Sequence, residues 1–210
     1  MDIFNSIAEK AHHAFEARNK ARDQALAQAR QLTRFAAHTI RAIHRSETVL
    51  AHENLDQAKA LVESLKTDLK TFPDLFYAGY TQDAIKEYAE ASITCAVIEN
   101  QPLPTPEALG IEYATYLNGL AETTGELRRR CLDILRQGYS TEAERLLTCM
   151  DEIYALLVTM DYADAITSNL RRHTDLVRGI VERTRADLTL SLRESRLQQA
   201  LQEVSKKLEK

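Results

Sequence analysis

One uninterrupted stretch decides the fold: residues 23–45 read DQALAQARQLTRFAAHTIRAIHR, without a glycine or a proline. Its apolar residues recur every three or four positions, which is the period of an amphipathic helix. No glycine or proline occurs before this stretch either, so the sequence predicts a first helix over about residues 2–45, roughly 65 Å long at 1.5 Å per residue. Such a helix is longer than the core of one domain needs.

Breaks elsewhere in the chain are few, because its 210 residues include only six glycines and four prolines. This scarcity argues against β-rich folds and glycine-cradled nucleotide folds. Between the breaks the pattern is helical over about residues 55–71, 82–100, 112–137, 141–160 and from 163 onward. We expect Thr81 and Ser140 or Thr141 to act as N-caps and Gly138 to be a C′ residue. The segment QPLPTP, at 101–106, is predicted to be a loop. We predict an all-α bundle of about six to seven helices, a single domain over residues 1–210 in which 195–210 form a C-terminal helical extension.

Charge and cysteine content narrow the class of protein further. The 27 basic and 31 acidic residues leave a net charge of −4, so a surface for a polyanion must be local. No segment approaches the roughly 18 apolar residues of a membrane span, and residues 1–24 are too charged for a signal peptide. The three cysteines form no CxxC pair, which argues against a disulfide framework or a zinc site. We expect a cytoplasmic protein without membrane association.

The first helix carries a candidate surface for phosphate groups. Residues 24–46 contain no acidic side chain, and at about 100° per residue four arginines share one face, opposite an apolar face. We call these four residues the basic stripe: Arg30, Arg34, Arg41 and Arg45. A row of guanidinium groups can follow a phosphate backbone, with counterion release favouring binding. A solvated face whose partners are acids on other helices is the alternative interpretation.

Carboxylates on the third helix are placed for a metal ion. Glu87 and Glu90 lie three residues apart, so their side chains share one helix face, at the edge of a largely apolar helix. Together they could bind a hard cation, although on spacing alone ion pairing with arginines is the favoured interpretation. Asp151 borders another apolar stripe, and Glu126 follows Gly125, a glycine that we expect to mark close helix packing.

Other site chemistries find little support in the sequence. A di-iron bundle needs a Glu-x-x-His pair on each of two helices, and only Glu9 to His12 has that spacing. The sequence contains no nucleophile elbow of the G-x-S-x-G type and no phosphate-binding P-loop.

Several motifs, in this order along the chain, resemble the translin family. Residues 86–91, KEYAEA, are similar to its E-Y-x-E-A segment, and residues 116–127, YLNGLAETTGEL, to its Y-L-x-G-(V/L)-x-D-x-x-G-E-L stretch. Weaker likenesses occur at residues 32–45, 150–154 and 181–188, so the resemblance spans about residues 30–193. The two glutamate-bearing motifs are its most specific part, and they match the catalytic, Trax-like members of prokaryotic type.

The resemblance implies a translin-like all-α fold and a barrel-like homo-oligomer, commonly an octamer, that encloses nucleic acid. It also implies Mg²⁺-dependent cleavage of single-stranded RNA, with single-stranded DNA as a further ligand. Matched residue by residue, the catalytic and metal-binding triad is Glu87, Glu90 and Asp151. Glu126 matches an acid that non-catalytic members share, and it is a further candidate metal ligand or a structural residue. Glu122 departs from the pattern, because the family commonly has aspartate there.

Two other functions stay open at this point. A translin-like protein that binds single-stranded RNA or DNA without cleaving it would share the basic stripe but would need no carboxylate cluster. A helical scaffold would use the long first helix for assembly alone, and its affinity for RNA would not depend on salt.

Overall fold

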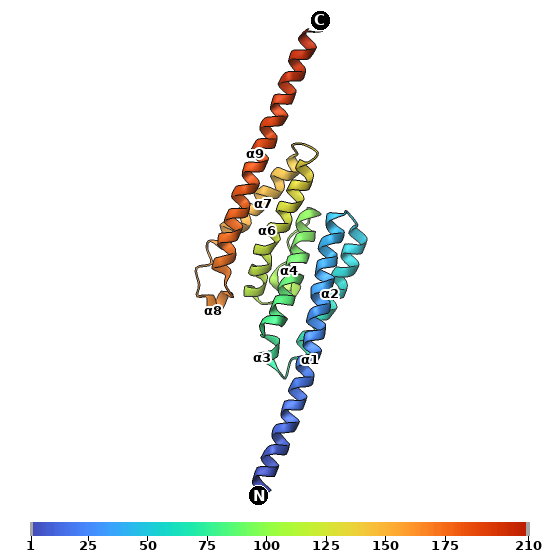
Figure 1. Ribbon diagram of the computed structural model, residues 1–210, viewed down its shortest axis with the longest axis vertical. Coiled ribbons are helices and arrows are strands. Elements are labelled where there is room, and N and C mark those ends of the chain that lie inside the picture. The colour runs from blue at the N-terminus through green and yellow to red at the C-terminus, as the bar shows by residue number, and fades with distance from the viewer. Residues whose placement is uncertain (1, 209–210) are drawn as a thin grey trace.

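Two long helices, one at each end of the chain, dominate the structure, a computed structural model that describes residues 2–208 (Figure 1). All regular structure in these residues is helical, which confirms the predicted all-α class. Six helices are long and three have four residues each, so the predicted number matches the long helices. The helices are α1 (Asp2–His44), α2 (Thr48–Asp68), α3 (Pro73–Phe76), α4 (Gly79–Ile98), α5 (Pro106–Leu109), α6 (Tyr113–Leu135), α7 (Thr141–Leu157), α8 (Asp164–Thr167) and α9 (Leu170–Leu208).

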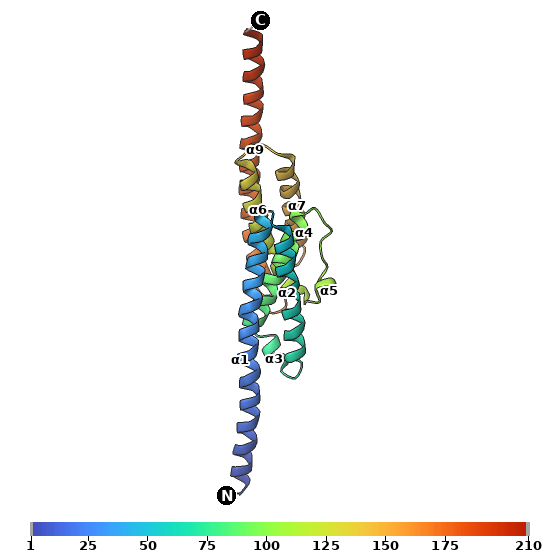
Figure 2. The same ribbon diagram turned by 90° about the vertical axis from the view of Figure 1, so that its right-hand side faces the viewer.

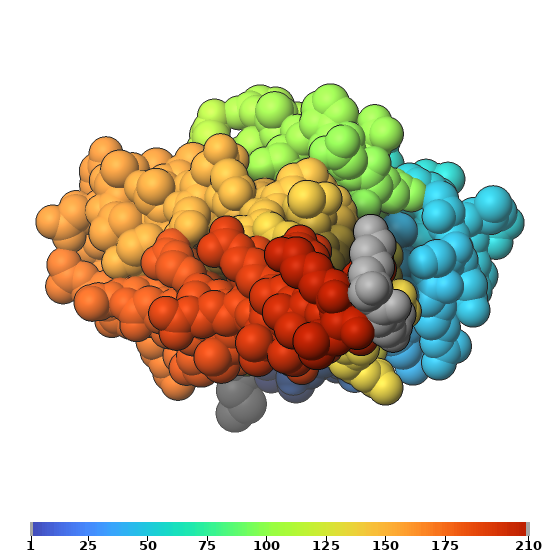
Figure 3. Space-filling view, turned by 90° about the horizontal axis from the view of Figure 1, so that it is seen from above, coloured from blue at the N-terminus to red at the C-terminus, as the bar shows by residue number. Residues whose placement is uncertain are grey.

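The long helices lie side by side in a fixed order. α1 packs between α2 and α4, α4 packs between α1 and α6, and α7 and α9 both contact α6 and each other. Seen along the long axis, the body is flattened, with α2 at one edge and the segment between α7 and α9, which includes α8, at the other (Figures 1 and 3). The segment around α5 stands out on one side (Figure 2). The beginning of α1 and the end of α9 project from opposite ends of the bundle (Figure 1).

The core forms where the apolar faces of these helices meet. On α1 the predicted apolar face is buried through Leu32, Ala36, Ile40 and Ile43. Tyr88 and other large side chains of α2, α4, α6 and α7 fill the centre: Leu65, Ile93, Leu127, Leu146 and Met150. Residues 2–17 of α1 and 195–208 of α9 bury almost nothing, so the tertiary contacts of both helices are confined to their inner parts.

Several predicted boundaries are wrong by a few residues, for local reasons. α2 begins at Thr48 instead of 55, because Ser46 adopts a positive φ of 61° and reverses the chain directly after α1. Thr81 is not an N-cap: it is buried inside α4, and its hydroxyl donates to the carbonyl oxygen of Leu75 over 2.9 Å. The last predicted helix is broken at Ser168 and Asn169, whose φ angles of 54° and 66° separate α8 from α9.

Other signals in the sequence are confirmed. Ser140 caps α7 by accepting a hydrogen bond from the amide of Glu142, and Gly138 has the positive φ of 110° expected after a helix. Pro106 opens a short helix, α5. The predicted extension 195–210 is helical as far as Leu208, and residues 209 and 210 lie outside the described residues. Among the described helices, none is both long and apolar enough to cross a bilayer.

Candidate metal centre and nucleic-acid interface

The two helices that carry the glutamate motifs cross at Gly119 of α6. A Cβ atom at this position would lie 2.8 Å from Cβ of Ala89, 2.9 Å from the carbonyl oxygen of Lys86 and 3.1 Å from the amide nitrogen of Glu90. These distances leave no room for a side chain, so glycine permits α6 to approach the backbone of α4. Gly125, which we expected to mark close packing, has nothing within 4 Å of a built Cβ. It is therefore Gly119, and not Gly125, that permits α6 to approach α4 closely.

This crossing brings three carboxylates together, and we call Glu87, Glu90 and Glu122 the acid cluster. One carboxylate oxygen of each lies within 4.8 Å of the others. The expected convergence of Glu87 with Glu90 is thus observed, because residues three apart on α4 share a face. Glu122 comes from α6, one helical turn beyond Gly119. It was noted in the sequence only as a departure from the family pattern.

Asp151 does not join these glutamates. It lies on α7 and accepts a hydrogen bond of 2.5 Å from Nη2 of Arg185 on α9, with 41% of its side chain exposed. α7 packs mainly against α6 and α9, so Asp151 faces α9 rather than α4. Among the described residues the acid cluster is the group of acidic side chains whose geometry could hold a metal ion. Its third carboxylate comes from α6, whereas Asp151 pairs with Arg185 on α9.

The negative charges of the acid cluster lie close together and are only partly balanced by a positive charge. Glu90 is 9% exposed, and its burial, reinforced by the charges of Glu87, Glu122 and Glu126, raises its pKa to about 8. Lys86 supplies the nearest positive charge: it forms an ion pair with Glu122, and its Nζ lies 3.5 Å from Glu87 Oε1. Burial lowers the pKa of Lys86, but its hydrogen bond to Glu122 and the neighbouring carboxylates outweigh burial and raise it. One lysine thus faces three carboxylates.

Glu126 lies beside the acid cluster and has partners of its own. Its Oε2 lies 2.6 Å from Nε2 of His44, whose side chain is 4% exposed, and 3.6 Å from Nη1 of Arg129. The hydrogen bond from His44 lowers the pKa of Glu126 against the opposing effect of burial. His44 itself is fixed at the end of α1, where its carbonyl oxygen accepts from Arg130. No signal in the sequence indicated this contact, which joins residues 82 positions apart.

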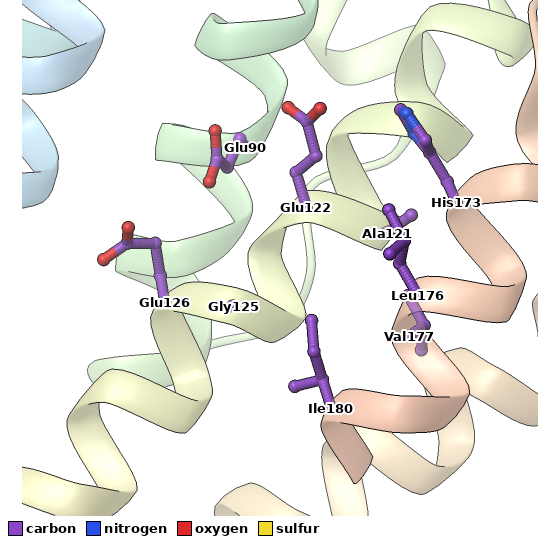
Figure 4. A pocket seen from close by; sticks show the side chains of 9 residues that line it. All are labelled: Glu90, Ala121, Glu122, Gly125, Glu126, His173, Leu176, Val177 and Ile180. Atoms are coloured by element: carbon purple, nitrogen blue, oxygen red, sulfur yellow. The ribbon is translucent and has the colours of Figure 1, made fainter.

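A pocket of about 310 Å³ opens between the acids and α9. Figure 4 shows Glu90, Glu122 and Glu126 along one side and His173 with Leu176 on the other. The acid side is contributed by α4 and α6, and the opposite side by the first turns of α9. The carboxylates are therefore reachable from a hollow large enough for part of a substrate.

The basic stripe lies on the outer side of α1. Arg30, Arg34, Arg41 and Arg45 are all exposed, opposite the buried apolar face of the same helix. None of the four forms an ion pair within residues 2–208; Arg41 donates only to the carbonyl oxygen of Ala37. The interpretation in which acids of other helices neutralise the basic stripe finds no support in the chain itself. Its guanidinium groups are free to bind an external anion.

Fold and site together define an all-helical protein in which a carboxylate centre lies one helix away from an arginine-lined surface. No family model matches the chain. An uncharacterized protein of Methanocaldococcus jannaschii is 31% identical over 190 residues, which cover 89% of this chain and 83% of that protein. The chain also resembles the crystal structure of AfC3PO, with a TM-score of 0.83 and 31% identity over 90% of this chain and 98% of that one.

Two further structures agree with this result. A complex of AfC3PO with duplex RNA has a TM-score of 0.82 and 32% identity, covering 90% of this chain and 98% of that one. Apo-NeC3PO has a TM-score of 0.80 at 18% identity, over 88% of this chain and 96% of its own, which supports the fold alone. The chain belongs to the translin family, which includes the C3PO proteins.

Proposed function

We propose that this protein is a cytoplasmic, Mg²⁺-dependent endoribonuclease that cleaves single-stranded RNA inside a barrel-like homo-oligomer. One observation carries the proposal: Glu87, Glu90 and Glu122 converge within 4.8 Å beside an open pocket. The exposed basic stripe and the structure of the related AfC3PO with duplex RNA support RNA as the ligand.

The chemistry of the acid cluster fits a magnesium ion. Its donors are all carboxylate oxygens, and Mg²⁺ binds through a few carboxylates while it keeps waters and substrate phosphate oxygens. Zinc and other softer metals favour histidine and cysteine ligands, and the described residues place neither type in the group. Burial, together with the negative charges of Glu87, Glu122 and Glu126, raises the pKa of Glu90 to about 8, and Lys86 opposes this shift only in part. A divalent cation would supply the missing positive charge.

Each residue of the site has a distinct task in this proposal. Glu87, Glu90 and Glu122 hold the ion, which when bound would acidify an attacking water and offset negative charge on the phosphate. Lys86 orients Glu122, and His44 keeps Glu126 ionised at the edge of the pocket. The basic stripe guides the strand by contacts with its phosphates.

Conservative substitutions test the assignment. We expect Glu87→Gln, Glu90→Gln and Glu122→Gln each to lower Mg²⁺-dependent cleavage of a labelled single-stranded RNA by about a hundredfold or more, because several kcal/mol of transition-state stabilisation is lost. Asp151→Asn is the matched control, since Asp151 pairs with Arg185 outside the acid cluster. Full cleavage by the three glutamine variants, or its loss in Asp151→Asn alone, would contradict the assignment. Duplex RNA and single-stranded DNA, tested in parallel, define the substrate class.

The projecting helix ends support the proposal of an oligomer. The beginning of α1 exposes Phe4, Ile7 and Phe15, and the end of α9 exposes Leu197 and Leu201. Apolar side chains on unpartnered helices are typical of association surfaces. Light scattering after size exclusion measures the number of subunits directly, and a monomer at micromolar concentration would refute this part of the proposal.

A further inference from the structure

A second pocket, of about 230 Å³, adjoins the first one and shares Glu122 and His173 with it. Its walls come from the beginning of α4, from α6, and from the residues around the start of α9. Lys86 lies between the two pockets, because it lines this one and pairs with Glu122 and Glu87 of the acid cluster. A ligand in this pocket would therefore lie directly beside the proposed metal centre.

The wall at α9 is built to receive an anion. α9 has 39 residues, and the first amides of a helix have no carbonyl partner within it and carry a partial positive charge. Ser168, Asn169 and Arg172 line the pocket at this helix start. Within residues 2–208 the side chains of Asn169 and Arg172 form no hydrogen bond or ion pair, whereas the neighbouring Arg171 is bound to Asp161. The side chains of Asn169 and Arg172 are thus available to a ligand, whereas the amides of Arg172 and His173 already donate to the carbonyl oxygen of Asn169.

The opposite wall offers hydrogen-bond acceptors. Asn118 is only 3% exposed and lines the pocket; its Nδ2 donates to the carbonyl oxygens of Ala114 and Thr167, but its Oδ1 is buried without a partner. An unpaired buried acceptor is unfavourable unless a donor reaches it, so it points to a ligand that brings a hydroxyl or an N–H group. Asp83 adds an exposed carboxylate on the same side, with no partner in the described residues.

We propose that this pocket is a ribose–phosphate subsite, which holds one nucleotide of the RNA strand next to the acid cluster. The phosphate lies at the start of α9 against Asn169 and Arg172, and a ribose hydroxyl faces Asn118 and Asp83. Lys86 pairs with Glu122, and Arg172 and the start of α9 supply positive charge at the α9 end of the pocket. At about 230 Å³ the pocket is smaller than a typical drug-sized site, so the base lies outside it. The inference rests on the proposal that RNA is the substrate.

A single atom change tests the phosphate end. Asn169→Asp keeps the size and the helix-start position of the side chain, where aspartate is equally suited, but it places a negative charge in the pocket. We expect about tenfold weaker binding of a short single-stranded RNA in EDTA, with an unchanged melting temperature. Asn100→Asp is the matched control, because Asn100 is exposed, has a similar φ of 55° and lies outside the pocket. Equal affinities of the two variants would overturn the proposal.

A second pair of variants keeps the test independent of the first. Arg172→Gln removes one phosphate contact, so we expect the slope of log affinity against log salt to become shallower by about 0.7. Arg171→Gln carries the same charge change one residue away and should leave the slope unchanged. The RNA is used with a 5′-phosphate and with a 5′-hydroxyl, which tells whether the pocket takes a terminal phosphate or one within the strand. Identical slopes for Arg172→Gln and Arg171→Gln contradict the subsite.

A separate measurement, the preference for RNA over DNA, tests the contact with the ribose hydroxyl. Asp83→Ala removes an exposed acceptor, and we expect it to lower the preference for RNA over DNA of the same sequence by a few fold. An unchanged ratio would overturn the ribose contact. All of these measurements are made in EDTA without cleavage, so they can succeed even if the protein proves not to be a nuclease. Conversely, Mg²⁺-dependent cleavage with normal binding by every variant would leave the proposed function intact and remove the subsite.

Discussion

Glu90 should lower the stability of the folded protein in the absence of a divalent metal. The folded state holds the proton of Glu90 up to about pH 8, whereas the unfolded chain releases it near the ordinary glutamate pKa of 4.5. Between these values the folded state binds more protons, so the free energy of unfolding falls as the pH rises. Below about pH 4.5 both states are protonated and the contribution disappears.

The size of the effect follows from the difference between the two pKa values. At about 1.4 kcal/mol per unit, the difference of about 3.5 amounts to about 5 kcal/mol above pH 8, and to about 3 kcal/mol at pH 7. Glu90→Gln removes the charge and keeps the shape. We therefore expect the variant to be more stable than the wild type in EDTA at pH 7, by about 6–12 °C in melting temperature.

Thermal unfolding at pH 5, 7 and 8, with EDTA or with Mg²⁺, measures the difference in melting temperature between Glu90→Gln and the wild type. The advantage of Glu90→Gln should be largest at pH 8 and small at pH 5, and Mg²⁺ should raise the melting temperature of the wild type more than that of the variant. Asp151→Asn serves as the control, since its exposed ion pair contributes less than about 1 kcal/mol. A Glu90→Gln variant that melts at or below the wild-type temperature in EDTA at pH 8 would refute the reasoning.

Three further predictions follow from the same geometry. Gly119→Ala should destabilise the protein by about 1–3 kcal/mol and weaken Mg²⁺ binding, because the added Cβ meets the backbone of α4. In Gly125→Ala the added Cβ meets nothing, so this variant should be neutral or slightly stabilising. Thermal melts and metal titrations compare the two variants. His44→Ala should raise the pKa of Glu126 and destabilise the protein at neutral pH. Because a lowered carboxyl pKa stabilises the folded state only where the carboxylate is ionised, the difference in stability from wild type should shrink as the pH falls below about 4.5. A constant difference across a pH series of thermal melts would argue against this role of His44. Replacing all four arginines of the basic stripe by glutamine should make the salt slope of RNA binding shallower by up to about 3, at about 0.7 per phosphate contact, and an unaltered slope would remove the stripe from the interface.

The helices were largely predictable because their signals are local. α1 ends at His44, one residue from the expected position, since a long stretch without glycine or proline has only one regular structure open to it. Two of the errors lie at Ser46 and at Ser168–Asn169, where non-glycine residues adopt positive φ. Such backbone angles are stabilised by the packing of the flanking helices, and periodicity of apolar residues carries no information about them.

The site was predictable to the extent that it lies on one helix. Glu87 and Glu90 meet because α4 is helical, but the third acid depends on which helix crosses α4 and where. The expected Asp151 lies on a helix that faces α9, and Glu122 is brought in by the crossing at Gly119. A glycine within a helix marks a close approach only if a neighbour is there. Gly125, in the same helix, has none.

The amino-acid sequence by itself determined the all-helical class, the exposed arginine row on α1 and the pairing of Glu87 with Glu90, because each depends on a rotation of about 100° per residue along a single helix. The tertiary structure alone decided that Glu122 completes the acid cluster, that His44 binds Glu126 and that the start of α9 borders a pocket. These contacts join residues 32, 82 and about 50 positions apart, and they are set by how closely whole helices can approach one another.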